Sequence, residues 1–567
     1  MARCWCIFIL ENFNFYNIFT FHLNKKEFMK AHKGTIFGFL FIFSNLLLGQ
    51  VNLTKSNLPI LKINTRGSEI LDDPKINADL KIIDNGPGKE NNINDAALGY
   101  DGKIQIELRG STSQWFPKKP YGFETVDASG ESNDVSLLGM PKENDWILNA
   151  TYNDKSLMRD GLAYILAGSI MEYATRVRYT ELTLNNQYQG IYLLLEKIKR
   201  DKNRVDIPKL EASDISGDDL TGGYIIKLDK ETGNNSGLGW NSRYAPFVGS
   251  PNRPFFQYEY PKADDIHNIQ KTYIKNHIDN FENILAGPGY KDPVNGYKKL
   301  IDTKSLADFI IINEIAKNPD AYRLSTFFYK ERESDGGKIK FGPVWDFNLG
   351  FGNVDYCTQG NTEGLVLLNF NQVCPDDGWV VHFWWKKFLE DKAFYDELKE
   401  RWKMYRKNQF SDQRLTTVID SLNNLLAQAQ VRNFQKWPVL GEYIWPNYYV
   451  GQSHAEEVKY LKDWLLKRVK YLDKVWAIQD SSIIGKETLL SKVYPNPADD
   501  LLILTVNLKS RVPDIIFYNT VGQSFTLKSK IIGETEMHID FSNLLPGLYI
   551  GKIALDDQIQ TFKVVKN

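Results

Sequence analysis

Apolar and polar residues alternate in short runs over the first half of the chain, and apolar residues recur at helical spacing over much of the second half. The alternation predicts strands at residues 60–64, 103–108, 120–125, 145–150, 179–184, 190–195 and 222–229. Apolar positions three and four residues apart predict helices at residues 157–171, 265–284, 303–315, 384–406, 411–433 and 454–476. The rest of residues 51–100 and the Gly- and Asn-rich segment 233–254 are expected to be loops. This mixture indicates the α+β class.

One predicted hairpin brings two acidic residues together. Two short runs, residues 326–330 (TFFYK) and 338–344 (KIKFGPV), flank Ser-Asp-Gly-Gly at 334–337, whose glycines can adopt positive φ. Because a hairpin returns the chain to its start, Asp320 and Asp346 are expected at the same end of it. Paired carboxylates there suit a divalent cation. The alternative is that Asp320 caps a turn and neighbouring backbone holds Asp346.

A second candidate segment is the loop Arg-Gly-Ser-Thr-Ser at residues 109–113, between two predicted strands. Backbone N–H groups and hydroxyls of such a loop can bind phosphate, and Arg109, Lys118 and Lys119 add positive charge. A plain hairpin with a solvated basic edge explains the same residues.

Length and charge limit the function classes. The chain has 567 residues with 43% hydrophobic and 25% charged content, which predicts two or three globular domains. A net charge of −1 gives no indication of nucleic-acid binding. Several of the 13 Trp and 29 Tyr lie in mixed polar stretches such as residues 441–449 (GEYIWPNYY), which fits either packing or an exposed binding surface.

The N-terminal residues predict export. Residues 29–50 have a short basic start, an apolar run and small or polar residues at the end, as in a signal peptide. Residues 1–28 are then expected to be an extension from a start codon assigned too early. No later segment approaches ~20 consecutive apolar residues, so no transmembrane span is expected in the mature chain. In an oxidising compartment Cys357 and Cys374 would form a disulfide worth about 3 kcal/mol; a buried free pair is the alternative.

Four segments resemble the CotH family of secreted, atypical protein-kinase-like proteins. They are WDFNLGFG (345–352), RGSTSQWFPKKPY (109–121), NDKSLMRD (153–160) and NQYQGIYLLLEKI (186–198), and the resemblance covers residues 61–476. It implies a two-lobed, atypical protein-kinase-like domain at residues 51–476, with ATP as substrate and Mg²⁺ as cofactor.

The resemblance also implies roles for individual residues. Asp320 would be the catalytic residue, and Asp346, Asn348 and Ser325 would be metal ligands. The nucleotide would be bound by Arg109, Gly110, Ser111, Ser113, Lys118, Lys119, Glu196 and Ile198. Two positions depart from the pattern, because Ser325 stands where a kinase has Asn and Asn348 stands where relatives often show a second acid. No Val-Ala-Ile-Lys motif is present, so the phosphate-holding cation is not assigned.

After a predicted linker at 477–490, residues 491–567 are predicted to form a small all-β sandwich. Its YPNP start, NTVGQ turn and LPGLY strand resemble the C-terminal sorting domain of type IX secretion substrates. This resemblance implies the type IX secretion machinery as a partner, and a protein that is secreted or attached to the cell surface.

Three functions fit these observations. The first is a secreted kinase that transfers phosphate from ATP to hydroxyls of a protein acceptor at the cell surface. The second is a catalytically weak or inactive kinase-like adhesion or scaffold module. The third is a carbohydrate-associated surface protein, which only the exposed aromatic residues suggest.

Overall fold

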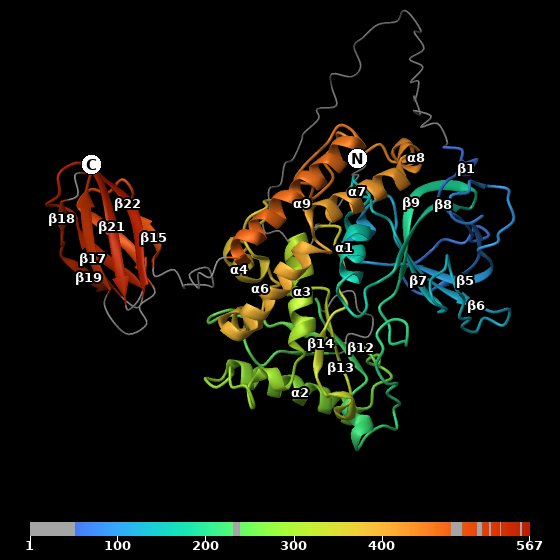
Figure 1. Ribbon diagram of the computed structural model, residues 1–567, viewed down its shortest axis with the longest axis horizontal. Helices are drawn as coiled ribbons and strands as arrows, with labels where there is room; N and C mark the ends of the chain where they lie inside the picture. Colours follow the sequence, from blue (N-terminus) through green and yellow to red (C-terminus); the bar gives the residue numbers. More distant parts are fainter. Residues whose placement is uncertain are drawn as a thin grey trace, which may run out of the picture. The chain divides into compact units, whose positions relative to one another are not determined.

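Figure 1 shows a computed structural model of the chain, which describes residues 51–230, 239–477, 490–506, 513–520, 523–532, 535–555 and 558–567. The predicted signal peptide at 29–50, the extension at 1–28 and residues 478–489 of the predicted linker lie outside the described residues. The described chain mixes helices and strands up to residue 477 and contains strands alone from residue 490 onward.

Seven strands close into a barrel in the order β2-β3-β5-β6-β7-β9-β8. Their bounds are β2 Ile60–Asn64, β3 Ile76–Ile83, β5 Tyr100–Leu108, β6 Tyr121–Val126, β7 Asp145–Asn149, β8 Val177–Leu184 and β9 Gln187–Glu196. Neighbouring strands are antiparallel except for β2 and β8, whose parallel pairing closes the barrel. The inward positions are apolar and form one buried cluster. Two short strands, β1 (Lys55–Ser56) and β4 (Asn91–Asn92), pair with each other.

The prediction of a loop over the rest of residues 51–100 is wrong at β1, β3 and β4, of which β3 is the longest. In β3, Ala78, Leu80 and Ile82 are buried, while Asn77 and Lys81 are exposed and Asp79 is half-buried. The polar outward positions lower the average hydrophobicity of the segment, although its alternation is that of a half-buried strand.

A second, five-stranded sheet has the order β11-β12-β10-β13-β14, with all pairs antiparallel. It comprises β10 Tyr224–Leu228, β11 Gly239–Asn241, β12 Phe255–Tyr260, β13 Thr326–Lys330 and β14 Ile339–Phe341. β13 and β14 form the predicted hairpin, with Gly336 at φ 110° and Gly337 at φ 67° in its connection. β14 is shorter than predicted because Gly342 has φ 120° and Pro343 has no N–H to donate. The expected loop at 233–254 contains β11, and its residues 233–238 lie outside the described residues.

Nine helices lie in the described part of residues 51–477. Their bounds are α1 Arg159–Gly168, α2 Asn268–Ala286, α3 Thr303–Ala316, α4 Val366–Val373, α5 Phe383–Glu390, α6 Lys392–Lys407, α7 Asp412–Leu426, α8 Ala429–Lys436 and α9 His454–Ala477. Residues 306–316 of α3 are all buried, and α3 contacts α1, α6, α9 and β14. Short 3₁₀ turns occur at Thr112–Trp115, Asp218–Thr221, Tyr297–Lys299 and Glu333–Asp335.

Two predicted helical runs are interrupted. The run 384–406 divides at Asp391, whose backbone is extended and whose carboxylate accepts the N–H of Ala393 at 3.1 Å, so that it caps α6. The run 411–433 divides into α7 and α8 around residues 427–428. Apolar periodicity continues through both breaks and therefore does not reveal them.

Residues 490–567 contain two four-stranded sheets, β15-β16-β20-β19 and β18-β17-β21-β22. The strands are β15 Leu490–Tyr494, β16 Leu501–Val506, β17 Asp514–Asn519, β18 Ser524–Phe525, β19 Ser529–Ile532, β20 Glu536–Asp540, β21 Gly547–Leu555 and β22 Gln558–Lys566. Residues of both sheets share one buried apolar cluster, so the predicted all-β sandwich is confirmed. Among the residues that the structure describes, no helix has the length and apolar character needed to cross a membrane.

Candidate active site

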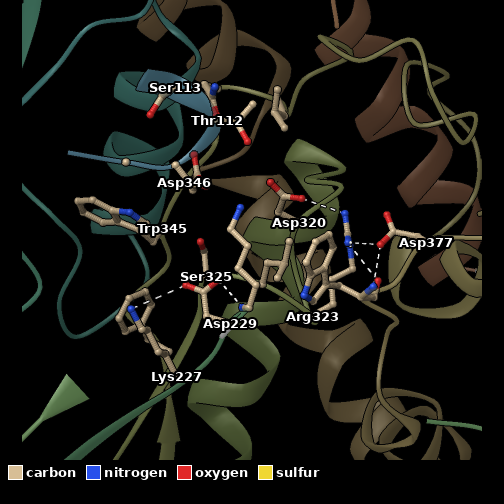
Figure 2. A pocket seen from close by; sticks show the side chains of 18 of the residues that line it. Thr112, Ser113, Lys227, Asp229, Asp320, Arg323, Ser325, Trp345, Asp346 and Asp377 are labelled. Atoms are coloured by element: carbon tan, nitrogen blue, oxygen red, sulfur yellow. Dashed lines mark hydrogen bonds and ion pairs between the residues drawn. The ribbon is translucent and has the colours of Figure 1, made fainter. Parts of the chain in front are cut away.

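A cavity of about 810 Å³ is lined by the loop that follows β5, by the wall of the second sheet and by residues at both ends of the β13–β14 hairpin (Figure 2). Asp320 and Asp346 both line it, so the fold-back of the chain brings the two acids to one cavity. Ser325 and Asn348 line the same cavity.

The carboxylate of Asp320 is held by Arg323. The Nη2 of Arg323 donates to Asp320 Oδ1 at 2.9 Å, and its Nη1 donates to Asp377 Oδ1 at 3.2 Å. The Asn318 side chain accepts the backbone N–H of Asp320 at 3.2 Å. Burial raises the pKa of Asp320, and the charge of Arg323 opposes this rise. The acid is therefore oriented by a buried guanidinium.

The backbone of Asp346 is left-handed, with φ 65°, which is unusual for an aspartate. Its N–H donates to the Tyr164 hydroxyl of α1 at 3.3 Å, and its carbonyl accepts from Asn318 Nδ2 at 2.9 Å. The next N–H, that of Phe347, donates to the buried carboxylate of Asp160 at 2.8 Å. These three contacts hold a conformation that costs on the order of 1–3 kcal/mol. Side chains of α1 thus fix the position of Asp346.

Crowding of acidic groups around Asp346 suits a bound cation. Burial, together with the negative charges of Asp320, Asp160 and Asp229, raises the pKa of Asp346 to about 8. A cation would relieve this repulsion, and the donor groups of Asp346, Asn348 and Ser325 are all oxygen ligands of the kind that Mg²⁺ takes. Among the described residues, no three His, Cys, Asp or Glu side chains form a metal-binding group by themselves. The residues fit Mg²⁺ held by one or two carboxylates with water and phosphate oxygens completing its coordination.

The loop predicted to contact phosphate faces the cavity. Arg109, Gly110, Ser111 and Ser113 all line it, as does Ile198 after β9. Gly110 has φ 90°, and a Cβ at this position would collide with the Ser113 hydroxyl. The guanidinium of Arg109 lies 5.7 Å from the ring centre of Trp345. A glycine is therefore required for the loop to fold tightly beside the cavity.

The other three predicted nucleotide contacts do not line the cavity. Lys118 is buried, and its ammonium donates to the Ile191 carbonyl at 2.5 Å and to Asn433 Oδ1 at 3.0 Å. Lys119 donates to the Gln114 carbonyl at 2.5 Å. Glu196 is fully buried and accepts from Arg176 at 2.9 Å and from Tyr173 at 3.1 Å. All three side chains bond to residues that do not line the cavity, and we leave them out of the proposed nucleotide site.

Two known families match parts of the chain. Residues 106–472, well over half of the chain, match the family described as CotH kinase protein. The chain belongs to the CotH family. Residues 492–567 match the secretion system C-terminal sorting domain, which indicates export by the type IX machinery to the cell surface or the medium.

None of the curated proteins compared matches this CotH-family chain. Among solved structures, the twitchin kinase region from C. elegans aligns over 91% of this chain and 99% of that chain, at 10% sequence identity and a TM-score of 0.15.

Three charged residues that line the candidate active site of this CotH-family chain were not predicted from the sequence. Lys227 and Asp229 at the end of β10 line the cavity together with Glu259 of β12. The Lys227 ammonium lies 3.4 Å from Glu259 and 3.8 Å from Asp229, and the Glu259 carboxylate also accepts from Lys262 at 2.7 Å. The lysine within the apolar run YIIKLD could have indicated them, because a charged residue in a buried strand usually has a partner of opposite charge.

A disulfide lines one side of the candidate active site. Cys357 and Cys374 are bonded, with 5.1 Å between their Cα atoms, and both line the cavity. Cys374 follows the last residue of α4 and precedes the segment that presents Asp377 to Arg323. The disulfide thus ties this segment to the loop that follows Asp346.

Proposed function

We propose that this chain is a secreted CotH-family phosphotransferase that uses Mg-ATP to phosphorylate hydroxyls of surface or extracellular proteins. In this proposal the barrel with α1 is the first lobe of a kinase-like domain, and the helical part with the second sheet is the other lobe. The observation that carries the proposal is the single cavity that brings Asp320, Asp346 and the Gly110 loop together.

The residues have separate tasks in the transfer. The bond between the γ-phosphorus and the β–γ bridging oxygen breaks, a bond to the acceptor hydroxyl oxygen forms, and Asp320 orients that hydroxyl and takes its proton. Arg323 fixes the Asp320 carboxylate for this purpose. Asp346, with Asn348 and Ser325, would hold Mg²⁺. When bound, the ion neutralises negative charge that develops on the phosphate oxygens.

The rest of the cavity matches the parts of ATP. Backbone N–H groups of the loop at 110–113 and the Arg109 guanidinium supply donors and positive charge for phosphates. Ile147, Ile198 and Phe327 supply apolar surface for a base. Positioning and charge neutralisation are the main requirements of phosphoryl transfer, and these residues can meet both.

Replacing Asp346 tests the proposal. Mg-ATP is expected to raise the melting temperature of the purified chain, and Asp346→Ala is expected to weaken Mg-ATP binding about tenfold or more, because a metal-holding charge is lost. Asp376→Ala is the matched control, since Asp376 is an exposed acid on the rim of the same cavity. Equal shifts in wild type and Asp346→Ala would contradict the assignment of Asp346.

Ser325 and Asn348 favour a second candidate, a kinase-like adhesion or scaffold module. Both side chains are uncharged, and a site with carboxylates at these two positions would bind a metal ion more strongly. Absence of any Mg-ATP shift in the wild-type chain, together with absence of phosphate transfer, would support the scaffold and reject the enzyme.

Lys227 is proposed as the cation that contacts the phosphates, because it lines the cavity and Glu259 holds it there. Lys227→Met is expected to weaken ATP binding by about tenfold or more, the value of a charge-assisted hydrogen bond. Lys262→Met is the control, because Lys262 pairs with the same Glu259 but does not line the cavity. Titration with ATP by calorimetry measures both, and equal affinities for the two variants would refute the role of Lys227.

A further inference from the structure

A second cavity of about 510 Å³ shares no lining residue with the candidate active site. Residues 360–363 form one side of it, and Tyr448, Tyr449 and the first half of α9 form the other. Tyr448 and Tyr449 belong to the aromatic segment 441–449 and line this cavity. The proposed phosphotransferase activity gives these two residues no role.

The aromatic rings of this cavity are held in fixed positions. Tyr448 is 50% exposed, and its hydroxyl donates to Asn361 Oδ1 at 3.1 Å. Its ring lies directly over Gly360, where a Cβ would collide with the ring atoms. Tyr449 stacks on Tyr460 with 4.3 Å between ring centres and 7° between ring planes. The cavity therefore offers preformed ring surface at little entropic cost on binding.

The polar groups around these rings carry both signs of charge. Glu363, Glu456 and Asp463 supply carboxylates, and Lys459 and Lys467 supply ammonium groups. Some are already oriented: Lys459 pairs with Asp463, and Glu456 accepts the N–H of Gln452 at 2.9 Å. Asn361 and Thr362 add neutral polar groups. Three negative and two positive groups do not favour a strongly charged ligand of either sign.

The ligand that matches this set is one with apolar faces and a rim of neutral hydroxyls. A pyranose ring presents C–H groups on its faces, which can cover an exposed tyrosine ring, and hydroxyls on its edge, which both donate and accept hydrogen bonds. Carboxylates accept from such hydroxyls and ammonium groups donate to them. We propose that this cavity binds a neutral polysaccharide chain, so that the exported protein is retained on, or directed to, a glycan surface.

Nearby aromatic residues extend the same kind of surface. Trp445 is 48% exposed, lines the candidate active site and stacks on Tyr356 with 6.4 Å between ring centres. Residues 445 and 448, only three positions apart, therefore line the two different cavities. A glycan bound at Tyr448 would lie on the segment that also borders the phosphotransfer cavity.

The test uses a panel of neutral hexose and N-acetylhexosamine oligosaccharides of about four to six units and the purified full chain. At least one member is expected to bind by calorimetry, and Tyr448→Ala is expected to weaken that binding about tenfold. Tyr443→Ala is the matched control, because Tyr443 is 54% exposed in the same segment but does not line this cavity. Glu363→Gln removes a carboxylate without removing ring surface and is expected to weaken binding less.

Three results would overturn the proposal: no panel member binds, Tyr448→Ala binds as wild type does, or Tyr443→Ala loses binding equally. Binding of peptides instead of oligosaccharides at Tyr448 would also reject it in favour of a protein-docking surface. Mg-ATP binding by the same samples separates this outcome from failure of the proposed phosphotransferase, since the two cavities share no residue.

Discussion

Asp320→Ala is expected to reduce transfer of γ-phosphate-labelled ATP to acceptor protein by about 10²–10⁴-fold, while Mg-ATP binding changes little. The residue follows α3, lines the cavity and is oriented by Arg323 at 2.9 Å. A group that orients a hydroxyl and takes its proton contributes to the transfer step and much less to binding of the nucleotide. Labelling of co-purified envelope proteins, followed by mass spectrometry, measures the transfer.

The Asp320→Ala fold is expected to survive, because Arg323 keeps its bonds to Asp377 at 3.2 Å and to the Trp379 carbonyl at 3.1 Å. Asp377→Ala is the control, because it removes the other carboxylate to which Arg323 donates and leaves Asp320 in place. It is expected to reduce transfer much less.

Two outcomes would contradict the role of Asp320. Retained labelling in Asp320→Ala would show that no proton acceptor is needed there. Loss of Mg-ATP binding in the same variant would instead make Asp320 a metal ligand.

Arg468→Met is expected to lower the free energy of unfolding by about 3–5 kcal/mol, because it leaves a buried carboxylate without its counter-charge. The Arg468 and Glu314 side chains are both 0% exposed and lie 2.8 Å apart. Arg468 also donates to three carbonyls, those of Glu314, Thr362 and Gly364, at 2.7, 2.8 and 2.6 Å. The pair therefore joins α9 to α3 and to the segment before α4.

The position of this pair links stability to the candidate active site. Glu314 also accepts the first N–H groups of α4, those of Val366 and Leu367, each at 3.1 Å. α3 leads into the segment that carries Asp320. Loss of Arg468 should therefore weaken the support of Asp320 as well as the fold as a whole.

Denaturant unfolding followed by tryptophan fluorescence measures the effect, because residues 491–567 contain no tryptophan and so contribute no signal. Arg406→Met is the matched control, since Arg406 pairs at 2.9 Å with Asp473, which is 38% exposed. A pair of this kind is expected to contribute only about 0–1 kcal/mol. The double variant Glu314→Gln with Arg468→Met should recover part of the loss. Equal effects of Arg468→Met and Arg406→Met would contradict the assigned importance of the buried pair.

Some of the site was predictable because it depends on local structure. The turn glycines 336 and 337 and the flanking apolar runs are close in sequence, so their hairpin and the meeting of its two ends follow from short-range preferences. The loop Arg-Gly-Ser is also local, since Gly110 allows the positive φ that the tight turn needs. Alternation predicted six of the seven barrel strands but not β3, whose outward residues are polar.

Other site residues could not be predicted, because long-range packing selects their partners. Lys118 and Lys119 are adjacent to the loop in sequence, yet Lys118 extends to Ile191 and Asn433, which are 73 and 315 positions away. Lys227, Asp229 and Glu259 enter the cavity only because β10 and β12 pair and face Asp320 across it. Asp160 lies in the predicted helix 157–171, and the apolar periodicity of that helix gives no indication that its carboxylate is buried and accepts the N–H of Phe347.

By itself, the sequence determined the α+β character, the hairpin that unites Asp320 and Asp346, the tight loop at Gly110 and the separate C-terminal β-sandwich. Each depends on the conformational preferences or periodicity of neighbouring residues. Only the tertiary structure decided which cations face the cavity, which acids surround Asp346 and which aromatic residues form a second cavity. These are contacts between segments tens to hundreds of residues apart. Packing and burial decide which side chains of a given type take part in them, and the pattern of neighbouring residues does not record that choice.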